Sequence, residues 1–166
     1  MATELNNLSD RSIGGDVDCS TFKVSIVVSE WNDSITGALH SGAVDFLKNA
    51  GVRPENIESH YVPGSFELPT AAQFVLEASD APDAVVCLGS VIRGETEHFT
   101  FVCNTVSQGV KDVSLKYNKP VIFGVLTDDT QEQAEARSGG KHGNKGVEAA
   151  AAAIKMIALK NRITGA

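Results

Sequence analysis

The fold is decided by residues 23–62, which read KVSIVVSEWNDSITGALHSGAVDFLKNAGVRPENIESHYV. Two short apolar runs, Lys23–Val28 and Ile57–Val62, are typical of buried strands. Between them, Ser34–Ala50 carries apolar side chains at helical spacing, and Gly51 follows as a helix stop signal. The stretch therefore predicts a strand, a helix and a second strand, the unit that builds parallel sheets through right-handed crossovers.

The same alternation continues to the end of the chain. Further strands are predicted at Ala84–Leu88 and Val121–Val125. Further helices are predicted at Phe66–Glu77, His98–Tyr117 and Asn144–Lys160, with a short helix that ends near Arg137. Because the strands are apolar without alternation, we expect helices on both faces of the sheet. The prediction is a three-layer α/β/α sandwich around a four-stranded parallel sheet, with its ligand site beyond the carboxyl ends of the strands.

Length and composition indicate one globular domain. The chain has 166 residues, of which 42% are hydrophobic and 21% charged. We expect a polar N-terminal arm at residues 1–22 and a single domain at residues 23–166. The formal charge of −7 argues against a surface that binds nucleic acid or anionic membrane as a whole. A run of 18 apolar residues, which a membrane span would need, does not occur in the sequence.

The cysteines and the first residues bear on the compartment. The chain has three cysteines, Cys19, Cys87 and Cys103. Because their number is odd and no C-x-x-C pair occurs, neither a disulfide framework nor a zinc site is predicted. A reducing compartment such as the cytoplasm fits best, and a plastid stays open. The first twenty residues lack the apolar region of a secretory signal. They could be a flexible arm or the remnant of a transit peptide.

Two of the predicted strands lead into loops that suit a ligand. Trp31 follows the first strand, and its flat ring could stack on a planar molecule or could instead cap the core. Gly64 and Ser65 follow the second strand, where Gly64 allows close approach of the backbone and Ser65 is a predicted N-cap. A plain capping turn without a ligand would have the same sequence pattern. The pattern is not a nucleophile elbow, because G-x-S-x-G is absent.

The third strand leads into GSVIRGETEH, residues 89–98. A glycine-rich stretch that enters a helix is a design for binding anions, through free N–H groups and the positive helix end. His98 would stand in the first turn of that helix, as a general base or simply as a surface histidine. A metal site is not expected, because His98 and Cys103 are five residues apart and do not share a helix face.

A local reversal of charge precedes the last predicted helix. Residues 137–146 contain Arg137, Lys141 and Lys145 but no acidic residue, in a chain of negative net charge. This pattern predicts a site for a phosphate or another small anion, although a solvated basic loop is the alternative. It is not a Walker A loop. Lys145 and Glu148 also have the spacing of an ordinary i,i+3 ion pair.

Over residues 23–159 the chain resembles the lumazine synthases. The matching segments are IVVSEWND, VPGSFELP, LGSVIRGETEHFTF, FGVLTDDTQEQAEAR and GGKHGNKGVEAA, in the family's order and at family-like spacing. The resemblance implies a flavodoxin-like fold and a transferase of riboflavin biosynthesis. The family condenses 5-amino-6-(D-ribitylamino)uracil with 3,4-dihydroxy-2-butanone 4-phosphate, which yields 6,7-dimethyl-8-ribityllumazine, phosphate and water. Neither a metal nor an organic cofactor is expected.

The resemblance also implies roles for individual residues. His98 is expected to transfer protons. The phosphate is expected at Glu95, Thr96 and Arg137, with Glu95 able to help only through its backbone N–H. The other residues expected to bind the substrates are Trp31, Ser65, Phe66, Glu67, Ser90, Val91, Ile92, Phe123 and Lys145. Phe123 is expected to reach the ring from a neighbouring subunit, and Lys145 is the weaker assignment.

The family assembles as pentamers, some of which pack into 60-subunit icosahedral shells. The short segment between Arg137 and Asn144 resembles the shell-forming members, whereas Trp31 is more usual in pentamers that hold flavin. Riboflavin and riboflavin synthase are therefore expected as further partners. Two alternatives stay open: a catalytically idle flavin-binding or shell protein on the same fold, and a flavodoxin-like electron carrier.

Overall fold

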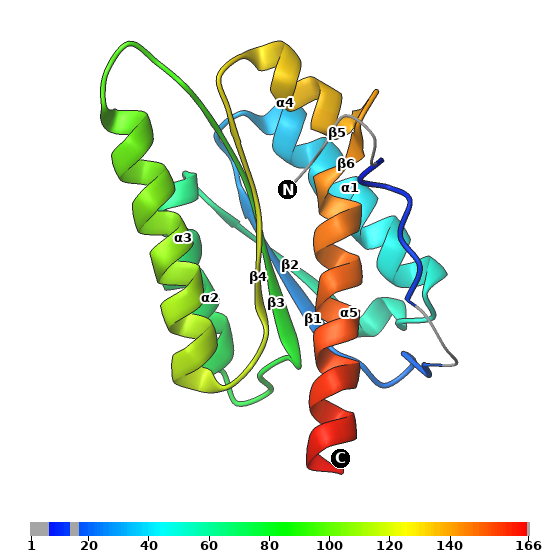
Figure 1. The fold of residues 1–166 in the computed structure, drawn as a ribbon. Helices are drawn as coiled ribbons and strands as arrows, with labels where there is room; N and C mark the ends of the chain where they lie inside the picture. Colours follow the sequence, from blue (N-terminus) through cyan, green and yellow to red (C-terminus); the bar gives the residue numbers. More distant parts are fainter. Residues whose placement is uncertain (1–6, 14–16, 166) are drawn as a thin grey trace.

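The computed structural model describes residues 7–13 and 17–165 (Figure 1). The remainder of the predicted arm, residues 1–6 and 14–16, lies outside the described residues, as does residue 166. One parallel sheet has the strand order β2-β1-β3-β4. Its strands are β1 (Val24–Ser29), β2 (Ile57–Val62), β3 (Ala84–Ile92) and β4 (Val121–Asp128). The predicted four-stranded parallel sheet is therefore confirmed.

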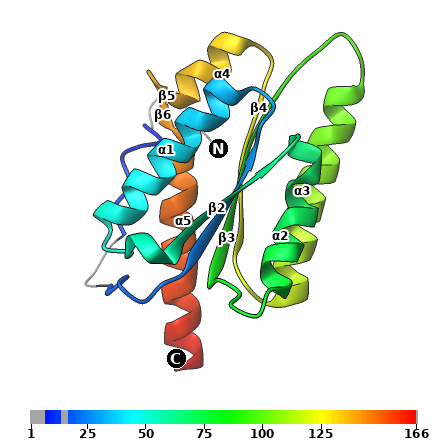
Figure 2. The same cartoon turned by 180° about the vertical axis from the view of Figure 1, so that it is seen from behind.

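Helices cover both faces of this sheet, as Figures 1 and 2 show. The helices are α1 (Asp33–Asn49), α2 (Leu68–Glu77), α3 (His98–Tyr117), α4 (Gln131–Arg137) and α5 (Lys145–Thr164). The short elements are the 3-10 turns η1 (Pro54–Asn56) and η2 (Ser65–Glu67) and the hairpin strands β5 (Ser138–Gly140) and β6 (Gly143–Asn144). Helices α2 and α3 lie on one face and α1, α4 and α5 on the other, which confirms the three-layer flavodoxin-like sandwich.

The core has two halves because successive strand side chains point to opposite faces. On β1, Ile26 and Val28 pack toward α1 and α5, whereas Val27 packs toward α2 and α3. All three are at most 1% exposed. A strand buried on both faces shows no polar alternation, which is why apolar runs predict β1 and most of β3. The prediction that Ile57–Val62 is a buried strand is wrong: β2 is an edge strand, and only Val62 in it is buried.

Strands β3 and β4 run further than the sequence pattern predicts. The predicted ends are Leu88, which Gly89 and Ser90 follow, and Val125, after which Thr127 and Asp128 come one residue later. In the structure the two strands continue to pair up to Ile92 and Asp128. The ladder between neighbouring strands supplies hydrogen bonds that local propensity cannot reveal. As a consequence, the carboxyl ends of β3 and β4 project beyond that of β1 and carry candidate site residues with them.

The described part of the arm packs against the β5–β6 hairpin and α5. Leu8 is 2% exposed, and its backbone N–H donates to the carbonyl oxygen of His142 at 2.8 Å. The backbone N–H of Asn144 donates to Ser9 Oγ at 2.9 Å. Arg11 forms an ion pair with Glu148 at 3.1 Å. These segments, distant in sequence, therefore lie side by side.

Asn144 begins α5 and joins three elements. Its Oδ1 accepts hydrogen bonds from the N–H groups of Gly146 and Val147, as an N-cap does. Its Nδ2 donates to the carbonyl oxygens of Ala38 in α1 and Ser138 in β5.

Within residues 7–13 and 17–165, each helix is too short or too polar to cross a lipid bilayer.

Candidate active site

A pocket of about 550 Å³ lies at the carboxyl ends of β1, β2 and β3. This is where the ligand site of a parallel α/β sheet is expected, and the volume suits a small organic ligand. The pocket is lined by Trp31, Asn32, Gly64, Ser65, Phe66, Glu67, Ser90, Val91, Ile92, His98 and Val102. They come from the loop after β1, from η2, from the end of β3 and from the first turns of α3.

Trp31 lies at this pocket and is 72% exposed. The alternative that it caps the core is therefore wrong. The next residue, Asn32, holds the loop in place: its backbone is left-handed at φ 62°, a conformation that asparagine tolerates better than most residues. Its side-chain amide donates to the carbonyl oxygen of Ser90 at 3.0 Å. An exposed, flat ring on a fixed loop is suited to stacking on a heterocycle.

Two of the residues that line the pocket, Ser65 and Ser90, have buried hydroxyl groups. A Cβ at Gly89 would stand 2.5 Å from Ser65 Oγ, so only glycine lets the η2 turn approach β3 this closely. Ser65 Oγ and Ser90 Oγ are buried, and among the described residues neither has a hydrogen-bond partner. Buried polar groups are nearly always satisfied, so a bound polar molecule is the expected partner for these hydroxyls.

The prediction that Ser65 is the N-cap of the second helix is wrong. Ser65 instead starts the η2 turn, α2 begins only at Leu68, and its N-cap position is Glu67, without a side-chain cap bond. The turn tightens the chain before the helix, because the close contact with Gly89 draws Ser65 against β3. The hydroxyl is thereby left for the pocket rather than for the helix end.

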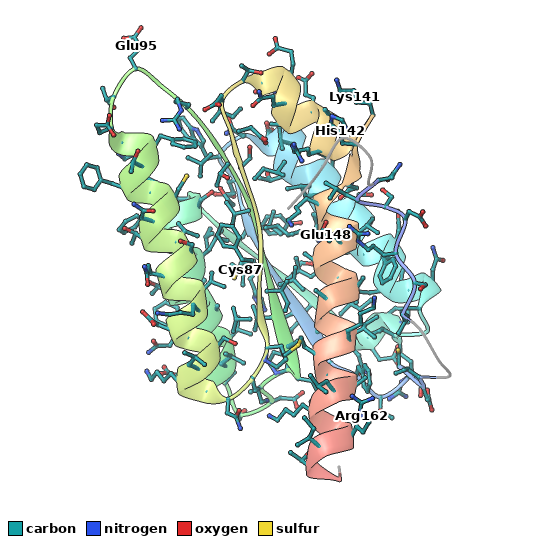
Figure 3. All side chains as sticks on the ribbon, in the orientation of Figure 1. Cys87, Glu95, Lys141, His142, Glu148 and Arg162 are labelled. Atoms are coloured by element: carbon teal, nitrogen blue, oxygen red, sulfur yellow. The ribbon has the colours of Figure 1, made fainter. Side chains whose placement is uncertain are left out.

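His98 is the first residue of α3, as predicted, and its exposed ring lines the pocket. The loop before it is anchored at its base by Arg93. Nε of Arg93 pairs with Asp129 Oδ1 at 2.6 Å, and the guanidinium lies 4.1 Å from the centroid of the Phe99 ring. The loop beyond Arg93 is exposed, and Figure 3 shows Glu95 at its tip.

The remaining predicted site residues lie outside the pocket. They are Glu95, Thr96, Phe123, Arg137 and Lys145. Phe123 is half-buried on the edge strand β4 and packs with the core under α2 and α3. Arg137 ends α4, on the opposite face of the sheet from α3. In Figure 3, Glu95 at the tip of the loop stands apart from Lys141 and His142 of the hairpin.

The basic segment of the sequence is partly neutralised in the fold. The predicted pair of Lys145 and Glu148 is confirmed, with Nζ 2.6 Å from Oε1. Arg137 pairs with Asp128, Nε to Oδ1, at 3.4 Å. Lys141 is exposed at the turn of the hairpin. The alternative of a wholly solvated loop is wrong, because this segment forms β5 and β6 and packs against the arm.

Sequence reasoning missed three residues of this region, of which Asn32 and Val102 line the pocket. Gly64, which the sequence marks as a point of close backbone approach, lines it as well. An asparagine directly before a helix is a turn signal that could have indicated Asn32. Asp128 has no signal in the sequence, because its contact with Arg137 depends on how α4 folds back on β4.

Comparison with known proteins gives a consistent result. The family model described as 6,7-dimethyl-8-ribityllumazine synthase matches residues 21–161. A protein of that name from Christiangramia forsetii is 52% identical over 160 residues, covering 96% of this chain and 95% of the relative. The relative from Cytophaga hutchinsonii is 54% identical, with 93% and 90% covered. That from Parabacteroides distasonis is 49% identical, with 95% and 98% covered.

Proposed function

Since the chain belongs to the 6,7-dimethyl-8-ribityllumazine synthase family, and is thus a transferase of riboflavin biosynthesis, we propose how its residues share the reaction. The substrates in this proposal are 5-amino-6-(D-ribitylamino)uracil and 3,4-dihydroxy-2-butanone 4-phosphate. The products are 6,7-dimethyl-8-ribityllumazine, phosphate and water. The observation that carries the proposal is the convergence of predicted site residues on one pocket, namely Trp31, Ser65, Phe66, Glu67, Ser90, Val91, Ile92 and His98.

The pocket at the ends of β1–β3 is proposed to hold the pyrimidine substrate. Trp31 offers an exposed aromatic face for the ring. The unpartnered hydroxyl of Ser65 can exchange hydrogen bonds with the polyol chain, and Ser90 lines the same pocket at the end of β3. A ligand with one planar and one hydroxylated end matches this pairing of a flat apolar surface with a buried hydroxyl.

The phosphate of the second substrate is proposed to bind Arg137, together with the exposed loop at Glu95 and Thr96. Helix α4, which Arg137 ends, lies across the sheet from α3, and Glu95 stands apart from the hairpin; both observations support a site that a second copy completes. In the proposal, the neighbouring subunit supplies Phe123, Arg137 and Lys145. Lys145 contributes least, because Glu148 already holds its ammonium group at 2.6 Å.

His98 is proposed to move protons between the condensing groups. The reaction joins an amine to a carbonyl and expels water and phosphate, so it needs several proton transfers but no redox step. Holding both substrates in place can supply up to roughly 7–11 kcal/mol of the acceleration. A positioned base adds typically about 10²–10⁴-fold. The exposed ring of His98 on the pocket is placed for that role.

Exposed apolar side chains support assembly into a pentamer. Tyr61, Phe66 and Phe74 are each more than half exposed, and a second pocket of about 510 Å³ opens beside the first and is lined by all three. Monomers rarely leave such patches uncovered. We propose a pentamer that packs further into an icosahedral shell. In solution the shell would measure about one megadalton and the pentamer about 90 kDa, given a 17.5 kDa chain.

Location and further partners belong to the same proposal. A cytoplasmic location is proposed because the three cysteines are free thiols, two of them buried. Riboflavin is proposed as a second ligand of Trp31, because its ring system is also planar. Riboflavin synthase is proposed as a partner because it would consume the lumazine product.

The direct test is an assay with both substrates that follows the lumazine product by absorbance. Turnover that needs both substrates supports the proposal. Tight riboflavin binding without turnover would favour the idle flavin-binding protein. A redox-active flavin mononucleotide in the purified protein would favour the electron carrier.

A further inference from the structure

A buried carboxylate stands behind the arginine assigned to the phosphate. Asp128 is the last residue of β4 and Arg137 the last residue of α4. Nε of Arg137 lies 3.4 Å from Oδ1 of Asp128, with 10% of the Asp128 side chain and 28% of the Arg137 side chain exposed. The pair therefore lies largely out of water, and the partly exposed arginine is the member that can reach a ligand.

The ion pair of Arg137 with Asp128 is made through Nε, which lies 3.4 Å from Oδ1. Among the described residues, the two terminal amino groups of Arg137 make no hydrogen bond. Guanidinium groups bind phosphate through parallel N–H donors in a fixed fork. A carboxylate that holds Nε from behind leaves the terminal groups for the anion and limits the rotation of the side chain.

Other charges at this point are already engaged. Asp129 pairs with Nε of Arg93, so neither of them serves Asp128 or Arg137. The backbone N–H of Arg93 donates to the carbonyl oxygen of Asp128, not to its carboxylate. Arg137 is consequently the cation that compensates Asp128 within the described part of the chain.

Asp128 is costly for the fold. Its Oδ2 is buried and has no hydrogen-bond partner among the described residues. Burial raises the pKa of Asp128 above its ordinary value; the positive charge of Arg137 acts against this rise, and Asp129 adds to it. Buried ion pairs can often be replaced by apolar residues of similar volume without loss of stability. A carboxylate kept here at such a cost indicates a role other than stability.

We propose that Asp128 is a positioning residue, which holds Arg137 by Nε so that the terminal amino groups of the guanidinium face the substrate phosphate. This inference rests on the proposed function, in which Arg137 binds that phosphate. It assigns specificity for the phosphorylated substrate to the pair rather than to the arginine alone. The pyrimidine pocket takes no part in it.

The test compares Asp128→Val with Asp128→Asn in the full-length protein. Valine fills a similar volume without an acceptor, but it leaves the charge of Arg137 without its partner, so some loss of stability is expected. Urea unfolding therefore checks that each variant is folded under the conditions of the kinetic assay. We expect KM for the butanone phosphate to rise about tenfold in Asp128→Val, with KM for the pyrimidine unchanged. Asparagine keeps an acceptor oxygen and should restore KM to within about threefold of the original. Glu132→Gln, an exposed change on the same helix, should leave both constants unchanged.

The Arg137→Ala background separates the two proposals. There, Asp128→Val should have no further effect, because its target is gone. If Arg137→Ala alone leaves KM for the butanone phosphate unchanged, the phosphate role in the proposed function is wrong. Three results would overturn the positioning role alone. In the first, Arg137→Ala raises KM for the butanone phosphate but Asp128→Val does not. In the second, Asp128→Val raises KM for both substrates equally, and in the third, its effect persists in the Arg137→Ala background.

Discussion

The side-chain amide of Asn32 donates a hydrogen bond to the carbonyl oxygen of Ser90, with 3.0 Å between nitrogen and oxygen. This bond ties the loop after β1 to the extended end of β3, so that Trp31 and the Ser90–Ile92 segment line the same pocket. Asn32 also has a left-handed backbone at φ 62° and ψ 49°. The side chain and the backbone conformation of this residue can be tested separately.

Asn32→Gly should remove the hydrogen bond but keep the backbone conformation. We expect a loss of about 1 kcal/mol in the free energy of unfolding and a higher KM for the pyrimidine substrate, because Trp31 is less well held. Asn32→Ala should lower the free energy of unfolding by about 1 kcal/mol more than Asn32→Gly does, since alanine is strained at positive φ. Urea unfolding and steady-state kinetics measure both. Equal stability of the two variants would show that the backbone conformation costs nothing here.

Gly89→Ala should disturb the floor of the pocket. The added Cβ would stand 2.5 Å from Ser65 Oγ and 3.0 Å from Leu68 Cδ1. Overpacking of this kind typically costs about 1–3 kcal/mol, and displacement of Ser65 should also raise KM for the pyrimidine. Gly94→Ala is the matched control, because no atom lies within 4 Å of its added Cβ. Similar thermal midpoints for the two variants would contradict the close approach of η2 to β3.

His98→Ala should slow turnover by about 10²-fold while changing substrate binding less, because positioning remains when the base is lost. The control is His142→Ala, which removes a histidine of the hairpin turn rather than of the pocket. Single-turnover measurements separate the chemical step from product release. An unchanged rate for His98→Ala would remove this residue from the mechanism.

Glu148 should contribute stability that depends on pH. Burial by itself raises the pKa of Glu148, but hydrogen bonds and positive charge from Lys145 and Arg11 outweigh burial and hold the pKa below its ordinary value of 4.5. A carboxyl group with a lowered pKa stabilises the fold above pH 4.5, and this contribution is lost as the pH falls through the pKa of the folded state.

The measurement is urea unfolding of the original protein and Glu148→Gln between neutral and acid pH. The variant should be the less stable at neutral pH, and the difference should shrink as the pH falls below 4.5. Glu55→Gln changes an exposed glutamate paired with Arg53 at 3.7 Å and should alter stability little throughout. A difference for Glu148→Gln that stays constant into acid would mean that Lys145 and Arg11 do not hold its charge.

The sequence by itself was enough for the four main strands, for the helices in outline and for most of one pocket. Buried strands read as apolar runs, amphipathic helices read as a repeat near 3.6 residues, and α3 begins and ends at the predicted residues. The loops after the strands could be located because the carboxyl ends of parallel strands share one edge of the sheet. That rule and the resemblance together predict that Trp31, Ser65, Ser90 and His98 lie at the pocket, and all four line it.

Only the tertiary structure decided the contacts between segments that are far apart in the chain. No local signal in the sequence predicts the strand order β2-β1-β3-β4 or the hydrogen bond from Asn32 to Ser90. The same is true of the fit of Ser65 against Gly89 and of the ion pair between Arg137 and Asp128. Periodicity reports which face of an element is buried, but not which element covers it. Packing makes that choice, and packing separates Arg137 from the pocket that the sequence had placed beside it.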